Sequence, residues 1–489
     1  MSKTSMSPAR AQSPVKIVAT LGPASSDPES LRDMIRAGMN VARLNFSHGT
    51  REEHRQRVEA LRKVAREEKV IVAILQDLCG PKIRIGKMEE GTSLRAGDEF
   101  SLVCGIDMGN SEIAYVDDAV LFSELEVGDH LLLADGMVEL VVESLEEQRA
   151  ECKILGGSQL SSGKGINVPR GLLRRDVLSI DDLKDLAFGA EIGVDWVGVS
   201  FVRTAKDLRY VRGQLAKLGK QTPVIAKIET AMALTHMGEI LDETDGVLLA
   251  RGDLALETPF EQVPIVQKEI IIEAHRRGKP VITATQMMVS MVKAFRPTRA
   301  EVNDVANAVL DGTDAIMLSE ETAVGDHPAL VIEVMSKIAA NAARSVKTQL
   351  RGEEGLEAEL VEMGVAAKAA CQIARELNAR GILTWTEGGL AVRLLARANP
   401  GIPIIAPTLD LDTARKLCLL RGVVPLFAPK FEVDPSTILK YLDAGKDEEG
   451  SLVIFGHERG EDGRRLSWIR IARLSDASTW VPNRGFRNS

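Results

Sequence analysis

Short apolar runs rich in β-branched residues alternate with amphipathic segments over much of the chain. Eight such runs lie between residue 16 and about residue 346, and the segments between them carry apolar residues at helical spacing. The runs are KIVATLG (16–22), VARLNF (41–46), VAILQDL (72–78), DWVGVSF (195–201), PVIAKIE (223–229), GVLLARGD (246–253), PVITATQM (280–287) and AIMLSE (315–320). Continuous apolar strands are typical of parallel sheets that are covered on both faces. The alternation predicts an α/β fold in which residues 15–86 and 173–346 form a (β/α)8 barrel.

The segment between the third and fourth runs has a different pattern. Residues 87–172 contain short stretches of alternating apolar and polar residues separated by tight turns, among them GDEFSLVCG and RAECKILGG. Alternation with a period of two predicts half-buried β-strands. Because a loop of this length without structure is uncommon in a compact domain, we expect a small all-β domain inserted into a loop of the barrel.

The pattern changes again after residue 346. Residues 347–357 (KTQLRGEEGLE) are polar and predict a linker. Residues 358–489 alternate helical segments with short apolar runs such as GILTW and PIIAPT, which predicts a doubly wound α/β domain. Residues 1–14 have no apolar stretch, so we expect a flexible N-terminal tail rather than a signal peptide.

Composition narrows the classes of function. The formal net charge of -9 at pH 7 argues against nucleic-acid binding, which depends on an excess of Lys and Arg. No run of eighteen apolar residues occurs, so no membrane span is expected. The five cysteines are scattered without metal-binding spacing, as is typical of the reducing cytoplasm, where we expect the protein to reside.

Polar residues stand at the carboxyl ends of most of the predicted barrel strands. In a (β/α)8 barrel this end carries the active site, because the loops that follow the strands meet there. The residues are Arg43, Asn45, Ser47, Asp77, Lys227, Glu229, Asp253, Thr285, Ser319 and Glu320. So many strands with polar ends predict a catalytic site at this mouth of the barrel.

The run VIAKIE places two opposite charges in an otherwise apolar strand. Side chains two residues apart in a strand point to the same side, so Lys227 and Glu229 are expected to lie together. Burying such charges costs several kcal/mol each unless they are paired or bind a ligand. Glu229 also ends the strand next to that of Asp253, and two carboxylates with open positions suit Mg²⁺ or Mn²⁺. The alternative is that both carboxylates only pair with Lys227 or Arg43.

The cations near this pair suit an anionic substrate. Lys227 can act as a point charge on a phosphoryl group in transfer, and Arg43 can bind a phosphate through two nitrogens. The turn ARGD (250–253) leads into a predicted helix, whose first N–H groups can bind a carboxylate or a phosphate.

Several blocks of the sequence resemble the signature segments of the pyruvate kinase family. They are VKIVATLGPASSD, GMNVARLNFSHG, GKGINVPRGLL, AKIET, DGVLLARGDLALE, ATQMM and RPTRAEVNDVANAVLDGTDAIMLSEETAVGDHP. They occur in order across the barrel, and the plan of three domains is similar over the whole chain. The resemblance implies transfer of a phosphoryl group from phosphoenolpyruvate to ADP, giving pyruvate and ATP.

The resemblance also implies roles for the residues at the substrate. Lys227 matches the lysine that stabilises the phosphoryl group in flight, and Arg43 matches the arginine that binds the phosphate. Gly252, Asp253 and Thr285 match the group that holds the substrate carboxylate. Thr285 would lie near the face where the enolate is protonated, and a water held beside it is our hypothesis for the proton donor.

Further roles concern the metal and the nucleotide. Glu229 and Asp253 match the ligands of a divalent metal, Mg²⁺ or Mn²⁺. The inserted domain resembles a β-barrel lid, and the implied nucleotide contacts are Asn45, His48, Arg84 and Lys164. On the sequence alone Lys164 would be a solvated loop lysine.

One departure from the family pattern concerns a monovalent cation. Many members bind K⁺ near the positions of Asn45, Ser47 and Asp77, with Thr-Lys after the aspartate and Glu in the following segment. This chain has LQDLCGPKIR (75–84), in which Lys82 stands in place of the Glu. Because an ammonium group carries the same unit charge as K⁺, we expect activity that does not require K⁺.

The C-terminal domain departs further from the family pattern. TWTEGGLAVR (384–393) stands where members regulated by sugar phosphates have a Ser/Thr-rich turn, and GHERGEDGRRLSWIRI (456–471) replaces a Gly-rich loop. Glu387 would repel a phosphate, whereas the turn of Gly388 and Gly389 before a predicted helix can accept one. Arg464 and Arg465 are either ligands or solvated charges. We therefore expect an allosteric domain whose phosphometabolite effector the sequence does not name, and the resemblance implies a homotetramer.

Two other functions fit part of this pattern. A magnesium-dependent barrel enzyme acting on a keto acid, such as an aldolase or lyase, would share the metal carboxylates but needs neither Lys164 on a lid nor Lys227 at a phosphoryl group. A non-catalytic relative that binds phosphometabolites would be expected to have lost one of the key residues. None is missing: Arg43, Lys227, Glu229, Asp253 and Thr285 are all present.

Overall fold

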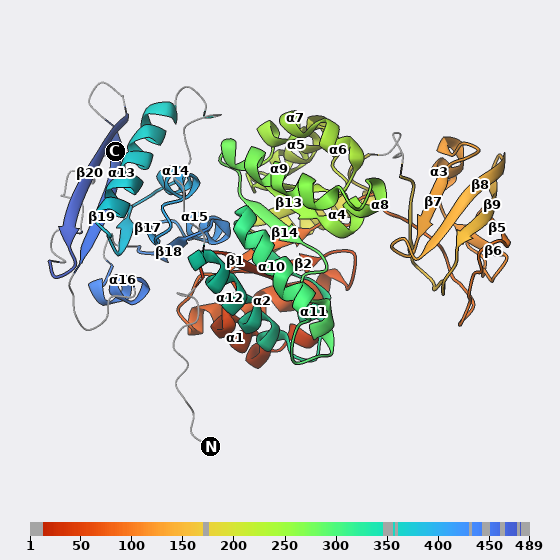
Figure 1. The fold of residues 1–489 in the computed structure, drawn as a ribbon, viewed down its shortest axis with the longest axis horizontal. Coiled ribbons are helices and arrows are strands. Elements are labelled where there is room, and N and C mark those ends of the chain that lie inside the picture. Colours follow the sequence, from red (N-terminus) through yellow and green to blue (C-terminus); the bar gives the residue numbers. More distant parts are fainter. Residues whose placement is uncertain are drawn as a thin grey trace, which may run out of the picture.

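The chain folds into three parts that lie in a row. The computed structural model describes residues 13–169, 176–345, 356, 360–429, 433–442, 450–459, 465–476 and 480. Figure 1 shows a central barrel, with the C-terminal part on one side and a separate β-rich part on the other. No helix in the described residues is long and apolar enough to cross a membrane.

The central part is a closed parallel barrel, as the strand–helix alternation predicts. Its strands follow the order β1-β15-β14-β13-β12-β11-β3-β2. Nearly every strand residue is buried, because the strands pack against the barrel interior on one face and against helices on the other. The strands are β1 (Lys16–Thr20), β2 (Val41–Asn45), β3 (Ala73–Asp77), β11 (Trp196–Val199), β12 (Val224–Ile228), β13 (Gly246–Ala250), β14 (Val281–Ala284) and β15 (Ala315–Leu318). The (β/α)8 fold is confirmed.

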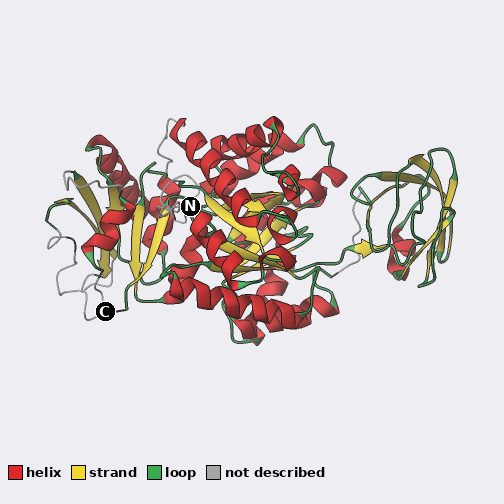
Figure 2. Ribbon diagram, turned by 90° about the horizontal axis from the view of Figure 1, so that it is seen from below, coloured by secondary structure: helices red, strands yellow, loops and turns green. Residues whose placement is uncertain are grey.

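Helices surround this barrel, as Figure 2 shows. Several begin at a capping box, in which a Thr or Ser and the residue three positions later satisfy each other's backbone N–H groups; Thr50 with Glu53 and Thr298 with Glu301 are two examples. The helices are α1 (Pro28–Ala37), α2 (Arg51–Glu67), α4 (Ile180–Ile192), α5 (Ala205–Lys217), α6 (Ala231–Thr235), α7 (Met237–Glu243), α8 (Arg251–Glu257), α9 (Val263–Arg276), α10 (Arg299–Asp311), α11 (Glu320–Ala323) and α12 (Pro328–Ser345).

The β-rich part is inserted between β3 and β11. Within the described residues its strands form one sheet in the order β4-β10-β7-β8-β9-β5-β6, with a hydrophobic core of its own. All neighbours are antiparallel except β5 and β6. The elements are β4 (Ile83–Arg84), β5 (Glu99–Cys104), β6 (Ile113–Val116), α3 (Ala119–Glu124), β7 (His130–Leu133), β8 (Val138–Glu146), β9 (Arg149–Gly156) and β10 (Gly165–Asn167). In Figure 2 this sheet stands apart from the barrel.

The C-terminal part is an α/β domain, as predicted. Its described strands have the order β18-β17-β16-β19-β20, and only β20 is antiparallel to its neighbour. The segment that replaces the family's Gly-rich loop thus contributes to a β-hairpin of β19 and β20. The elements are α13 (Val361–Glu376), β16 (Gly381–Leu383), α14 (Leu390–Ala398), β17 (Ile404–Thr408), α15 (Leu411–Lys416), β18 (Val423–Phe427), α16 (Pro435–Tyr441), β19 (Ser451–Arg459) and β20 (Arg465–Arg473).

Some predicted segments lie outside the described residues. They include residues 1–12 of the expected tail, the expected linker except for Leu356, and Arg464. Arg465 begins β20.

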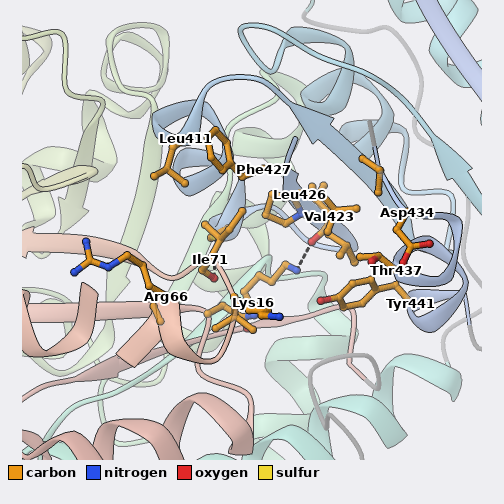
Figure 3. A pocket seen from close by; sticks show the side chains of 18 residues that line it. Lys16, Arg66, Ile71, Leu411, Val423, Leu426, Phe427, Asp434, Thr437 and Tyr441 are labelled. Atoms are coloured by element: carbon orange, nitrogen blue, oxygen red, sulfur yellow. Dashed lines mark hydrogen bonds between the residues drawn. The ribbon is translucent and has the colours of Figure 1, made fainter. Parts of the chain in front are cut away.

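The C-terminal domain packs against the amino ends of the barrel strands. Lys16, the first residue of β1, donates from Nζ to the carbonyl of Val423 at 2.5 Å, and Arg421 Nη1 donates to the carbonyl of Thr313 at 3.0 Å. A cavity of about 530 Å³ lies at this seam, with Ile71 on the barrel side and Tyr441 on the other (Figure 3). The opposite end of the barrel, where the strands finish, carries the predicted site residues.

Candidate active site

Four charged side chains from β2, β3 and the end of β12 form a buried cluster at the carboxyl end of the barrel. Lys227 on β12 places Nζ 3.0 Å from Oδ1 of Asp77 and 2.9 Å from Oε1 of Glu229. Arg43 on β2 donates from Nε to the other oxygen of Asp77 at 2.7 Å and from Nη1 to Oγ1 of Thr20 at 3.0 Å. Period-two alternation in β12 accounts for the shared side of Lys227 and Glu229. Glu229 thus pairs with Lys227, as the alternative for the two carboxylates expected, whereas Asp253 pairs with Lys82.

Burial and the neighbouring charges shift the pKa values of Lys227, Asp77 and Glu229 in different ways. Burial opposes the charge of Lys227, but the carboxylates of Asp77 and Glu229 outweigh burial and hold the pKa of Lys227 above its usual value. Burial likewise opposes the charge of Asp77, yet Lys227 and Arg43 keep its pKa below the usual range. For Glu229, burial and the nearby carboxylate of Asp253 prevail over Lys227 and raise the pKa. A further cation beside Glu229 would therefore favour its charged form.

Glu229 and Asp253 form a set of donors that fits a divalent metal. Oε2 of Glu229 accepts from the backbone N–H of Phe201 at 2.7 Å, and Oδ1 of Asp253 accepts from Lys82 Nζ at 3.1 Å. Carboxylate oxygens are the ligands that Mg²⁺ and Mn²⁺ prefer, and a cation between the two groups would relieve their repulsion. Three or more His, Cys, Asp or Glu side chains do not gather into a metal-binding group anywhere in the described part of the chain. Two protein carboxylates leave other coordination positions for water and substrate oxygens.

The ends of β13 and β14 are held together by hydrogen bonds. The N–H of Gly252 donates to Oγ1 of Thr285 at 2.8 Å. Thr285 and Gln286 have φ values of 70° and 53°, which are unfavourable for residues with a side chain. Such conformations persist only where the surroundings hold them, and they are frequent at active sites.

Arg251 is the residue that holds this strained segment, and the sequence interpretation missed it. Its guanidinium donates to both carboxylate oxygens of Asp304 at 2.6 and 2.7 Å, and Nη2 donates to the carbonyl of Thr285 at 2.8 Å. Asp304 comes from the middle of α10, so only the fold reveals that it faces the strand ends. The sequence signal for Arg251 was its place two residues before Asp253 in the charged turn ARGD.

Ser200 is a second residue that the strand pattern did not single out. It follows β11, accepts from Lys227 Nζ at 2.6 Å and donates to the carbonyl of Leu78 at 2.7 Å. Phe201 beside it has a φ of 54° and points its N–H at Glu229. The sequence signal that could have identified Ser200 is a polar residue near the end of an otherwise apolar run.

Two carboxylates near the mouth, the buried Glu321 and the half-buried Glu257, were also missed. Glu321, beside the predicted Ser319 and Glu320, accepts from the backbone N–H of Ser319 at 2.7 Å and from that of Met288 at 3.1 Å. It thereby ties the loops after β14 and β15 together. Glu257, at the end of α8, accepts from the N–H of Ala231, and burial raises its pKa to about 7.

The turn after β2 brings together Asn45, Ser47 and His48. Oδ1 of Asn45 accepts from the N–H of Ser47 at 3.2 Å, and the N–H of His48 donates to the carbonyl of Asn45 at 3.2 Å. Burial lowers the pKa of His48, and the positive charges of Arg84 and Arg43 lower it further. Arg84 from the inserted sheet is therefore near His48, as expected if both contact one ligand.

Lys164 lies on the loop that Arg84 supports. Arg84 Nη1 donates to the carbonyl of Gly163 at 2.9 Å, and the carbonyl of Lys164 accepts from the N–H of Ile85 at 2.9 Å. The side chain of Lys164 is exposed. It is thus free to reach a bound ligand.

Lys82 approaches the expected metal site rather than Asp77. Its ammonium contacts Asp253, whereas both oxygens of Asp77 are held by Arg43 and Lys227. Gly165 lies against the stem of Lys82, where an added Cβ would come within 2.6 Å of Cε. A side chain at position 165 would therefore displace Lys82.

A closed parallel barrel with buried cations and two metal-type carboxylates at the ends of its strands defines an enzyme that acts on a small anionic substrate. Comparison with known proteins identifies the group to which it belongs. The family model described as pyruvate kinase, barrel domain, matches residues 12–332, and that described as pyruvate kinase, alpha/beta domain, matches residues 365–457. The chain therefore belongs to the pyruvate kinase family and is a phosphotransferase.

Individual relatives agree with this assignment. Pyruvate kinase 2 of Synechocystis sp. is 41% identical over 448 residues, which are 90% of this chain and 75% of the relative. The pyruvate kinase of Sporosarcina psychrophila is 39% identical over 452 residues, covering 90% of this chain and 76% of the relative. The crystal structure of a pyruvate kinase from Cryptosporidium parvum has a TM-score of 0.85 at 30% identity, and the match covers 95% of this chain and 97% of that one.

Proposed function

We propose that the protein transfers the phosphoryl group of phosphoenolpyruvate to ADP, yielding pyruvate and ATP in glycolysis. The observation that carries the proposal is the buried position of Lys227 between Asp77 and Glu229, with Arg43 on the same mouth of the barrel. A buried ammonium whose charge is secured in this way is suited to face a phosphate. The alternative of an aldolase or lyase has no comparable support from the family models, which describe pyruvate kinase domains.

In this proposal the protein chiefly positions the reactants and stabilises charge, as is general for phosphoryl transfer. Arg43 binds the phosphate of phosphoenolpyruvate, and Lys227 contacts the phosphoryl group as it moves. Glu229 and Asp253 would hold Mg²⁺ or Mn²⁺, which would neutralise part of the negative charge of the substrate. The substrate carboxylate lies against Gly252, Asp253 and Thr285.

Protonation of the enolate completes the reaction. Thr285 Oγ1 already accepts from the N–H of Gly252 and donates to the carbonyl of Ala284 at 2.6 Å, so the hydroxyl has a fixed direction. We assign it the role of holding the water that delivers the proton to C3. Arg251 holds this strained segment through the carbonyl of Thr285, and this contact keeps the hydroxyl in place.

The nucleotide would bind between the barrel and the inserted domain. Asn45 and His48 come from the turn after β2, while Arg84 and Lys164 come from the inserted sheet and the loop before β10. We propose that residues 87–172 act as a lid that brings Lys164 to the phosphates of ADP. Excluding water from the transferring group is the expected benefit of such closure.

A coupled assay of pyruvate formation tests the proposed function. Purified protein with phosphoenolpyruvate, ADP and Mg²⁺ is expected to form pyruvate, and chelation of the metal with EDTA is expected to abolish the reaction. Omission of ADP serves as the control for hydrolysis. No turnover by folded wild-type protein across a range of substrate concentrations would contradict the proposal.

We further propose that Lys82 removes the need for K⁺. Its ammonium contributes a fixed positive charge 3.1 Å from Oδ1 of Asp253, at the same mouth of the barrel. Rates in K⁺, Na⁺ and choline salts at equal ionic strength are expected to agree within about twofold, because the ammonium of Lys82 supplies the unit charge that K⁺ would otherwise provide. A steep dependence on K⁺ alone would show that Lys82 does not supply this charge.

The C-terminal domain is proposed to regulate the enzyme in a cytoplasmic homotetramer. A phosphometabolite effector would bind near Gly388 and Gly389, where α14 begins without a side-chain cap and Gly389 has a φ of 80°. Glu387 beside this turn is exposed, so it can turn away from a bound anion. Ribose 5-phosphate, AMP and fructose 1,6-bisphosphate are suitable first compounds to screen as activators.

A further inference from the structure

His54 on α2 is a buried histidine beside the turn that carries His48. It is 2% exposed, and its ring stacks on Phe46 with centroids 4.3 Å apart and 18° between the planes. Nε2 of His54 lies 3.0 Å from the carbonyl oxygen of His48. The ring therefore touches both the first and the third residue of the segment FSH that follows β2.

Arg57 fixes the tautomer of His54. Its Nη1 lies 3.4 Å from Nδ1 of His54, and because a guanidinium can only donate, Nδ1 must accept. The proton of the neutral ring is therefore on Nε2, from which it is donated to the carbonyl of His48. Burial, followed by the charge of Arg57, lowers the pKa of His54 to about 4, so the ring is neutral near pH 7.

The same guanidinium connects the turn to the loop after β1. Nε of Arg57 donates to Oγ of Ser26 at 3.1 Å. Gly49 closes the turn with a φ of 79°, and an added Cβ there would lie 3.0 Å from Glu53 Oε2 and 3.3 Å from Arg57 Nη1. The turn is thus packed closely on α2, and a change at His54 or Arg57 is transmitted to His48.

We propose that His54 is a positioning residue for the nucleoside diphosphate, because it fixes the turn that carries His48 toward that ligand. The inference rests on the proposed role of His48 in binding ADP. His54 itself does not contact the reacting atoms in this account. His54 affects only the geometry of the turn after β2. Lys227 and Arg43 make other contacts in the proposed active site.

Two substitutions of His54 test this proposal. The first keeps the aromatic ring but removes the hydrogen-bond donor, and the second restores a donor. His54→Phe is expected to raise KM for ADP about fivefold to tenfold, since one buried hydrogen bond to the turn is lost, while kcat and KM for phosphoenolpyruvate stay within about twofold. His54→Gln retains an amide donor near the position of Nε2 and is expected to recover most of the affinity for ADP. Thermal unfolding of each variant shows whether it folds.

Arg55→Met is the matched control for this helix. Its guanidinium lies over Phe188 at 4.9 Å and pairs with Glu191 at the surface, and neither partner belongs to the turn, so KM for ADP should not change. An unchanged KM for ADP in His54→Phe, or equal losses in kcat and in both KM values, overturns the positioning role. Absence of ADP-dependent turnover in the wild type would instead refute the proposed function itself.

Discussion

Lys227→Met is expected to lower kcat by about a thousandfold or more, the effect typical of removing a charge that contacts a phosphoryl group in transfer. The ammonium lies 2.9 Å from Glu229 and 3.0 Å from Asp77, and no other Lys or Arg contacts both carboxylates in the described part of the chain. Arg43 remains paired with Asp77, so phosphoenolpyruvate should still bind. The measurement is a coupled assay at saturating substrates, with KM determined separately.

The same substitution should also weaken the fold. Without Lys227 the carboxylate of Glu229 is buried with only the N–H of Phe201 as its partner, and leaving a charge unpaired in this way costs ~3 kcal/mol. Thermal unfolding should therefore occur at a lower temperature, although much of the protein is expected to stay folded at 25 °C. Lys217→Met, at the exposed end of α5, is the control and should change neither kcat nor stability. Turnover of the Lys227 variant within tenfold of wild type would contradict the assigned role.

The barrel and its mouth could be predicted from the sequence because both depend on local patterns. Continuous apolar runs mark the parallel strands, and the residue at which each run ends marks the catalytic end of the barrel. This is why Asp77, Lys227 and Glu229 could be assigned to one place before the fold was known. Their mutual distances follow from the barrel closing at a fixed strand order.

The supporting residues could not be predicted, because their partners are remote in sequence. Asp304 belongs to a helix whose periodicity gives no reason to separate it from other surface carboxylates, yet it holds Arg251 through two bonds. Glu321 differs from its neighbour Glu320 only in the direction of its side chain. The strained φ of Thr285 is likewise set by tertiary contacts and leaves no trace in residue type. Local pattern therefore gives the charged groups at the mouth of the barrel, and the fold gives the groups that hold them.

Glu229→Gln is expected to lower the affinity for Mn²⁺ by about a hundredfold or more, because the amide keeps the shape of the side chain but removes one of two anionic ligands. The fold should survive this change. Lys227 keeps Asp77 as its partner, and the amide oxygen can still accept from the N–H of Phe201. Burial and the carboxylate of Asp253 raise the pKa of Glu229, and an uncharged amide avoids both penalties, which offsets part of the lost pairing with Lys227.

Metal binding can be measured without catalysis, by titrating Mn²⁺ into the substrate-free protein and recording the electron paramagnetic resonance signal of the free ion. Glu257→Gln is the matched control, because Glu257 is a half-buried carboxylate in the same region that accepts from the N–H of Ala231 and is not assigned to the metal. Its affinity for Mn²⁺ should stay within about threefold of wild type. Equal losses in both variants would mean that general negative charge, rather than direct ligation by Glu229, attracts the cation. Wild-type affinity in Glu229→Gln would place the metal elsewhere, since Asp253 alone offers a single carboxylate already paired with Lys82.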